Sequence, residues 1–214
     1  MSASTVALPA GTGAPADPTT ERILDAALAQ FLDFGLRRTT VEDVAARAGV
    51  TRVTVHRRVG RKSDLVQAVI LRELTRFLHD FTEALEPLAT LEEKLVEGFV
   101  VTMRSARLHP LITRILATEP ETLLPELTVD GGPYLTAASS FLVDQVRSEA
   151  QGYVAEDVAA IGEIFIRLVA SFVLTPDGAV AIGDDASART FARRHLAPLL
   201  GTARRRPRTT GRRK

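Results

Sequence analysis

The chain has 214 residues, of which 45% are hydrophobic, and a formal net charge of +1. This length accommodates one large domain or two small ones with a sizeable core. The absence of cysteine excludes disulfides and thiolate metal sites. Neither a secretory signal nor an unbroken apolar run of about 20 residues is present. The composition therefore predicts a soluble, cytoplasmic protein with no membrane segment.

Residues 1–18 are rich in Ala, Thr, Pro and Gly, and they predict a disordered tail. A helix is expected from Thr20 to Phe34. Apolar side chains recur there at helical spacing and predict one buried face, formed by Ile23, Ala27, Phe31 and Phe34. Gly35 is expected to end this helix.

Residues 39–65 predict two short helices joined by a glycine turn. Thr40 is placed to cap the first helix, whose apolar face consists of Val41, Val44 and Ala45. Gly49 supplies the backbone freedom that is needed where this helix ends. Thr51 is placed to cap the second helix. Two helices with a short glycine turn form a helix-turn-helix, whose second helix enters the DNA major groove.

The second helix and the turn after it carry only positive charge. From Thr51 to Lys62 there is no acidic residue, and the basic residues are Arg52, Arg57, Arg58, Arg61 and Lys62. Such a run alone is typical of a solvated charged helix, but the caps and the turn, together with the family spacing described below, favour double-stranded DNA as its partner. The predicted DNA-contacting residues are Thr40, Thr51, Arg52, Thr54, His56, Arg57, Arg58 and Lys62.

These DNA-contacting residues divide by their place on the helix. Arg52 and Thr54 lie near its start, where side chains reach base edges. Arg57 and Arg58 lie further along, and Lys62 opens the next helix. These later positions suit contacts with phosphates.

The same part of the chain resembles the TetR family of bacterial transcriptional regulators. The matching features fall in order at the family's spacing over the first third of the chain, and they are Ile23-Leu24-Asp25-Ala26-Ala27, Phe31, Gly35, Thr39-Thr40, Val44-Ala45, Ala48-Gly49-Val50, Thr54, Lys62, Asp64 and Leu65. At the end of the recognition helix, where the family has Tyr, one residue and then His-Phe, this chain has His56, Arg58 and Val59. These departures bear on individual phosphate contacts and on operator specificity more than on the fold.

The remainder of the chain predicts helices only, so the fold class is all-α. The expected helices span Ser63 to Glu86, with Ser63 as a cap, then Leu91 to Leu108, Tyr134 to Ala150, Val154 to Leu174 and Asp184 to Leu200. The expected domains are a disordered tail at 1–18, a helix-turn-helix DNA-binding domain at 19–65, a helical regulatory and dimerisation domain at 66–201, and a basic disordered tail at 202–214. That last tail is expected to be solubilising or to attract DNA weakly and without sequence preference.

The helix from Val154 to Leu174 is apolar on more than one side, which predicts burial on more than one side. It is either a central core helix or a helix that packs on its own domain and also on a second subunit. The TetR resemblance implies dimerisation through the last two long helices. The candidate dimer-interface residues are Ile161, Phe165, Leu168 and Phe172.

A ligand pocket is a further expectation for the second domain. Its candidate lining residues are Phe99, Met103, Phe141 and Phe165, although each is more often plain core. The resemblance implies a DNA-binding regulator, usually a repressor, that works as a homodimer and is released from operator DNA by a small ligand, here hydrophobic. One alternative is a regulator with no small-molecule effector. The other is a small helical enzyme, against which no nucleophile motif, phosphate-binding glycine loop or metal-ligand cluster is found. No cofactor or metal is expected.

Overall fold

The computed structural model describes residues 17–122 and 124–204. Within these ranges the chain is helical, and its single pair of bridged residues outside helices is Tyr153 with Arg204. The predicted all-α fold is confirmed. Most of the predicted tails at 1–18 and 202–214 lies outside the described residues.

The chain forms two compact units, each with its own core. One contains residues up to Glu83 and Arg104–Gly132, and the other contains Ala84–Met103 and residues from Pro133 onward. The chain passes between them inside helix α4 (Lys62–Leu85), after Glu83, inside helix α5 (Leu91–Leu108), after Met103, and again after Gly132. We keep the division after residue 65 as a proposal about function, because it separates the DNA-reading motif from the rest of the chain.

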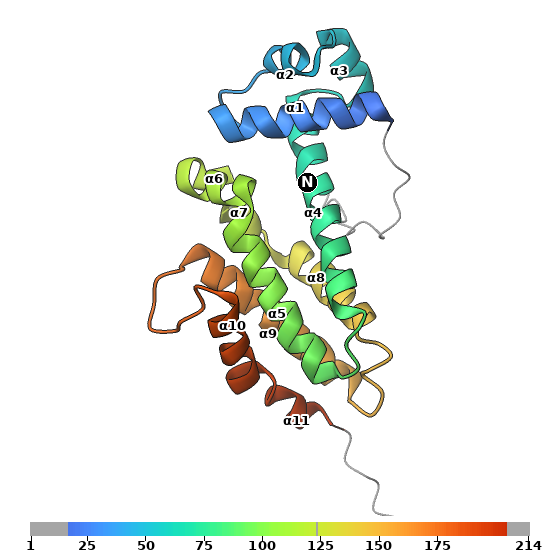
Figure 1. The fold of residues 1–214 in the computed structure, drawn as a ribbon, viewed down its shortest axis with the longest axis vertical. Helices are drawn as coiled ribbons and strands as arrows, with labels where there is room; N and C mark the ends of the chain where they lie inside the picture. Colours follow the sequence, from blue (N-terminus) through green and yellow to red (C-terminus); the bar gives the residue numbers. More distant parts are fainter. Residues whose placement is uncertain (1–16, 123, 205–214) are drawn as a thin grey trace, which may run out of the picture. The chain divides into compact units, whose positions relative to one another are not determined.

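The first unit begins with three helices packed around one core. They are α1 (Pro18–Phe34), α2 (Val41–Ala48) and α3 (Arg52–Arg58). Helix α1 packs on α2, and α2 packs on α3, so that α2 and α3 lie along one side of α1 (Figure 1). The long helix α4 (Lys62–Leu85) follows. The unit also contains α6 (Pro110–Thr118), the short turn η1 (Pro120–Thr122) and α7 (Leu124–Leu127).

Apolar spacing explains why these elements form one core. The buried set combines α1, α2, α3 and the start of α4 with two residues of α6, Leu111 and Ile115. Helix α6 therefore completes the core of the unit that holds the helix-turn-helix, although about 50 residues of sequence separate them. The predicted α1 residues Ile23, Ala27 and Phe31 are buried as expected.

Two local predictions in this unit were wrong. Phe34, expected on the buried face of α1, is 51% exposed, because it is the last residue before Gly35 turns the chain away. Ser63 does not cap α4, because the helix already includes Lys62. The carboxylate of Asp64 accepts the backbone N–H of Arg61 instead, at 2.7 Å.

The second unit consists of much of α5 with α8 (Gly132–Gln145), α9 (Ala155–Leu174), α10 (Asp185–Phe191) and α11 (Leu199–Ala203). The single helix that was expected from Asp184 to Leu200 is in fact interrupted. A π-helical turn, η2 (Ala192–Leu196), follows α10, and Pro198 precedes α11. The helix expected to run from Tyr134 to Ala150 ends at Gln145.

Aromatic side chains fill the core of the second unit. Phe99 lies at its centre, and its ring centroid is 5.8 Å from that of Phe165 and 5.5 Å from that of Phe191. Such pairs add to the stabilisation from apolar burial. Within residues 17–122 and 124–204, no helix combines the length and apolar character that a bilayer span requires.

Candidate nucleic-acid interface

Local capping fixes the first helix of the helix-turn-helix. Thr40 Oγ1 accepts the N–H of Asp43 at 3.2 Å, and the Asp43 carboxylate accepts the N–H of Thr40 at 2.9 Å, which is a complete capping box. Hydrogen bonds from the Thr40 hydroxyl and then from its backbone N–H hold the pKa of Asp43 below the ordinary value. Gly49 ends the helix at φ 65° and ψ 35°, the left-handed region that favours glycine.

The second helix, α3, is fixed in the same way. Thr51 Oγ1 accepts the N–H of Thr54 at 3.2 Å. Val55 is the one buried residue of α3, and it anchors the helix in the core. The side chains of Arg52, His56, Arg57 and Arg58 are left exposed, so four of the predicted DNA-contacting residues lie on the surface of one short helix, whereas Lys62 lies at the start of α4.

Three of the basic residues among the predicted DNA contacts have partners within the first unit. Arg52 pairs with Glu42 of α2 at 2.7 Å, and Arg58 pairs with Asp17, the cap of α1, at 3.0 Å. The Lys62 ammonium donates to the carbonyl of Arg37 at 2.7 Å. The sequence did not predict the roles of Glu42 and Asp17, because each lies in a different helix or cap from its arginine and so outside the three- and four-residue spacing of a single helix.

The loop between α1 and α2 is held from its other side by α6. Glu119, at the end of α6, is 8% exposed and accepts the backbone N–H of Arg37 at 3.1 and 3.3 Å. Gly35 gives this carboxylate room, because a Cβ there would collide with Oε1 of Glu119. The backbone of Arg37 therefore links two helices: its N–H donates to Glu119 at the end of α6, and its carbonyl oxygen accepts from Lys62 at the start of α4.

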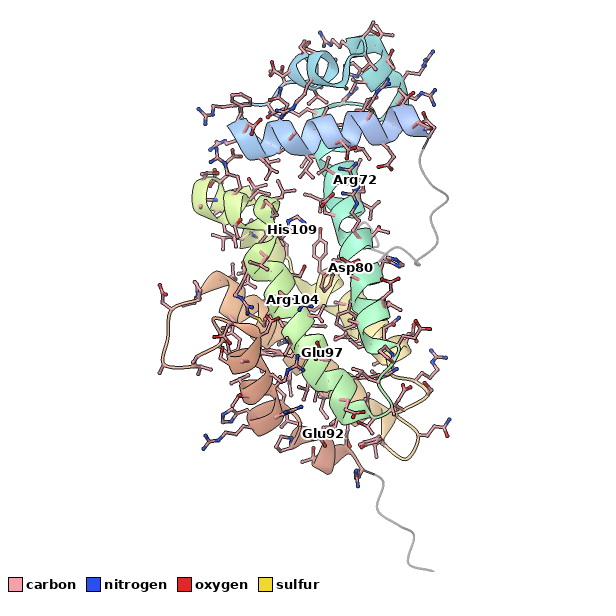
Figure 2. The ribbon with its side chains drawn as sticks, in the orientation of Figure 1. Arg72, Asp80, Glu92, Glu97, Arg104 and His109 are labelled. Atoms are coloured by element: carbon pink, nitrogen blue, oxygen red, sulfur yellow. The ribbon has the colours of Figure 1, made fainter. Side chains whose placement is uncertain are left out.

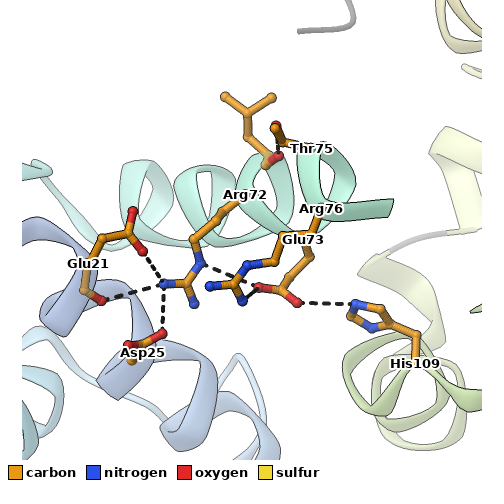
Figure 3. Close-up of polar contacts among 8 residues, drawn as sticks. Glu21, Asp25, Arg72, Glu73, Thr75, Arg76 and His109 are labelled. Carbon is orange, nitrogen blue, oxygen red and sulfur yellow. Dashed lines mark hydrogen bonds and ion pairs between the residues drawn. The ribbon is translucent and has the colours of Figure 1, made fainter. Parts of the chain in front are cut away.

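A second polar cluster joins α1, α4 and the start of α6 (Figure 3). Arg72 of α4 has a side chain only 9% exposed, and it pairs with Glu21 at 3.1 Å and with Asp25 at 2.8 Å. Glu73 lies between Arg72 and His109, whose Nε2 is 3.4 Å from the carboxylate. Figure 2 shows Arg72 on α4 and His109 where α6 begins. The N-terminal half of α4 is thus tied to α1 by ion pairs as well as by packing.

In the second unit, the predicted pocket residues are largely core. Phe99, Met103 and Phe165 are buried in one cluster, whereas Phe141 of α8 is half-buried. Of the predicted dimer-interface residues, Ile161 and Phe165 are buried within their own chain, and Leu168 and Phe172 are half-buried. The exposed side of α9 instead carries Ala160, Glu163, Ile164, Arg167 and Ser171, with Glu163 and Arg167 paired at 2.7 Å.

Two family models match the chain over these two parts. The model described as "Bacterial regulatory proteins, tetR family" matches residues 23–69, which include the helix-turn-helix. The model described as "Bacterial Tetracyclin repressor, C-terminal domain" matches residues 91–193. The chain belongs to the TetR family.

Relatives of this TetR-family chain are also transcriptional regulators. The HTH-type transcriptional regulator AlkX of Mycobacterium tuberculosis is 26% identical over 181 residues, which cover 82% of this chain and 85% of AlkX. SrpR of Pseudomonas putida is 38% identical over 95 residues, but these cover only 44% of this chain and 42% of SrpR. The sequence similarity to SrpR is therefore partial.

Solved structures share the fold of this TetR-family chain. The TetR family repressor AlkX from Dietzia sp. has a TM-score of 0.64 and 24% identity, and the match covers 86% of this chain and 98% of that one. A TetR-family regulator from Pectobacterium atrosepticum has a TM-score of 0.59 and 22% identity, over 92% of this chain and all of that chain. The TetR-family chain is accordingly a helix-turn-helix transcriptional regulator with a C-terminal helical domain.

Proposed function

We propose that this chain is a repressor that binds operator DNA as a homodimer and is released by a small hydrophobic ligand. The observation that carries the DNA part is the capped helix α3, which buries Val55 and exposes a row of basic side chains. A recognition helix of this kind reads base edges near its start and phosphates around it. The proposed contacts are Thr40, Thr51, Arg52, Thr54, His56, Arg57, Arg58 and Lys62.

Repression is the direction that the relatives favour. A probable acrEF/envCD operon repressor of Escherichia coli is 32% identical over 108 residues, which cover 47% of this chain and 48% of that protein. A repressor acts by occupying its operator, and occupancy needs no contact beyond the DNA itself. The proposed activity therefore depends on DNA affinity and on its control.

Dimerisation supplies enough base contacts for a specific site. One helix-turn-helix offers few contacts, and a two-fold pair doubles them on a pseudo-palindrome whose halves lie about 34 Å apart. The family's regulators are dimers. We place the contact on α9, and its exposed row of Ala160, Ile164, Arg167 and Ser171 is the surface open to a second copy. Phe165 and Ile161 then support this surface from beneath.

The ligand proposal depends on the aromatic core of the second unit. Phe99, Met103 and Phe165 are buried together with Phe172 and Phe191 packed beside them. A ligand that separates these side chains would be apolar, because the groups that it meets are apolar. It would loosen DNA only to the extent that it prefers the released state, typically 5- to 150-fold.

The deciding experiment begins with DNA. Purified protein is titrated into duplexes that flank its gene and into scrambled duplexes of the same length and composition. Tight, salt-sensitive binding to one flanking duplex alone supports the proposal, and equal binding to both duplexes contradicts it. Lipophilic compounds that raise the melting temperature are then titrated into the complex. If every stabilising compound leaves DNA affinity unchanged, the chain is a regulator without such an effector.

A further inference from the structure

The two valines of α3 have opposite environments. Val55 is fully buried in the core of the first unit, whereas Val53 is 74% exposed. A single exposed apolar side chain is ordinary on a protein surface. Val53 is different because it stands on the helix that the proposed function assigns to the DNA major groove.

Helical geometry places Val53 on the outermost face of α3. It lies two residues before the buried Val55, which is about 200° around the helix. Arg57 lies two residues after Val55 and so shares that outer face. Side chains four residues apart are neighbours, with Cβ atoms roughly 5–6 Å apart. Val53 and Arg57 therefore form an outward ridge, and Val55 fixes its direction.

Charged partners distinguish this ridge from its flanks. Arg52 is held by Glu42 of α2, and Arg58 is held by Asp17. Among the described residues, Arg57 makes no ion pair. The flanking arginines are thus drawn toward α2 and the start of α1, while Val53 and Arg57 project from the helix without such a restraint.

The chemistry of this ridge matches two features of the major groove. Arginine donates two hydrogen bonds to O6 and N7 of guanine, and an apolar side chain contacts the C5-methyl group of thymine. We propose that Val53 is a specificity-determining residue that contacts a thymine methyl group. The outward face that it shares with Arg57 assigns Arg57 to a neighbouring guanine, in place of the phosphate contact expected from its position along the helix. This inference rests on the proposed DNA-binding function. Residues four apart are separated by about 6 Å along the helix, so the two bases lie about two steps apart.

The test removes the methyl group from the DNA and the side chain from the protein. Duplexes that wild-type protein prefers are selected from a random pool, and each thymine in turn is replaced by deoxyuridine, which lacks only the methyl. Affinities are measured for wild type, Val53→Ala and Val129→Ala. Val129 is the matched control, because it is 86% exposed, belongs to the same unit and lies outside α3.

The expected result is a coupling at one position of each half-site. Deoxyuridine there weakens wild type and Val129→Ala by about fourfold, the effect of one buried methyl group. Val53→Ala binds the thymine and deoxyuridine duplexes equally. An Arg57→Ala protein loses preference for a guanine about two base pairs away.

Two outcomes would overturn the inference, and they are distinct. If the wild type selects a sequence but every deoxyuridine affects Val53→Ala as it affects wild type, Val53 does not read thymine although the proposed function stands. If the wild type selects no sequence at all, the proposed function and the inference fail together. Equal melting temperatures of the three proteins exclude a folding defect as the cause.

Discussion

The carboxylate of Glu119 accepts the backbone N–H of Arg37 through both of its oxygens, at 3.1 and 3.3 Å, across 82 residues of sequence. The carbonyl oxygen of the same residue, Arg37, accepts a hydrogen bond from the Lys62 ammonium at 2.7 Å. Glu119 is nearly buried and directly follows α6, and Arg37 lies in the loop before α2. Their hydrogen bonds therefore fix the end of α6 next to that loop. The position of the DNA-reading motif therefore depends on a residue far outside it.

Glu119→Ala is expected to destabilise the first unit by about 1–3 kcal/mol. The variant leaves the partly buried N–H of Arg37 without its acceptor, and an unpaired donor of that kind costs about this much. The measurement is urea unfolding monitored by circular dichroism. Glu121→Ala is the matched control, since Glu121 pairs with the Arg37 side chain at the exposed surface. That variant should change stability by at most about 1 kcal/mol, and an equal loss in both variants would contradict the role of Glu119.

Arg52→Ala is expected to weaken binding to the cognate duplex by roughly 1–3 kcal/mol and to relax preference at one base pair. Arg52 is exposed at the start of α3, where side chains reach base edges. Gel-shift titrations on cognate and singly substituted duplexes measure both effects. An Arg52→Ala protein with unchanged base preference would remove Arg52 from the reading residues.

Lys62→Ala is expected to weaken binding to all sequences alike. Its ammonium lies at the start of α4, bonded to a neutral carbonyl, and is free to face a phosphate with its remaining donors. Removing one phosphate contact lowers the slope of log K against log salt by about one. Affinities at a series of salt concentrations test this, and a loss confined to the cognate sequence would contradict it.

Ile164→Arg is expected to yield monomers at micromolar concentration. Ile164 is 43% exposed on the outer side of α9, and a further positive charge buried there against the same face of a second copy, which already carries Arg167, would cost several kcal/mol. Light scattering gives the mass directly. Val180→Arg is the control, because Val180 is also 43% exposed but lies outside the helices. Dimers in both variants would move the interface away from this face of α9.

The buried pair of Lys94 and Glu149 predicts a dependence of stability on pH. The two groups lie 3.0 Å apart, and the hydrogen bond from Lys94, followed by one from Ser148, lowers the pKa of Glu149. A carboxyl group whose pKa is lowered in the folded state stabilises the protein at any pH above the ordinary pKa of the group, which is 4.5 for glutamate. That contribution disappears as the pH falls through the lower, folded value.

Glu149→Gln isolates this contribution to stability. At neutral pH it should cost about 3 kcal/mol, because it leaves the Lys94 ammonium buried without its charged partner. The cost should shrink as the pH falls below the ordinary range of a glutamate. Thermal or urea unfolding from pH 7 to pH 3 measures the difference from wild type. A difference that stays constant over this range would show that the charge of Glu149 does not contribute.

Local signals in the sequence predicted the helix-turn-helix in detail. Thr40 and Thr51 cap their helices as expected, and Gly49 has the left-handed backbone that was predicted. These features depend on residues within four positions of one another, so their spacing in the sequence already encodes the contact. The exposure of Phe34 was missed, because helical spacing continues up to the last residue while the core does not.

Contacts between distant segments could not be predicted in this way. The docking of Glu119 on Arg37 and the burial of Arg72 among carboxylates of α1 depend on how α6 and α4 pack, which no local pattern encodes. The π-helical turn at 192–196 was likewise hidden, since its sequence reads as ordinary helix up to Pro198. The sequence also did not distinguish the exposed face of α9 from its buried face. In the structure Ile161 and Phe165 are buried in the core of their own chain, which leaves the opposite face exposed.

The ion pairs of Arg52 with Glu42 and of Arg58 with Asp17 neutralise part of the positive charge on the DNA-binding surface with carboxylates of the protein itself. When Arg58 turns to a phosphate, the DNA releases condensed cations, but the carboxylate of Asp17 loses its partner and attracts cations from solution. The net release of cations is therefore smaller than for the contact made by Lys62, whose partner is an uncharged carbonyl. Binding should therefore resist rising ionic strength better than the number of basic residues on this surface implies.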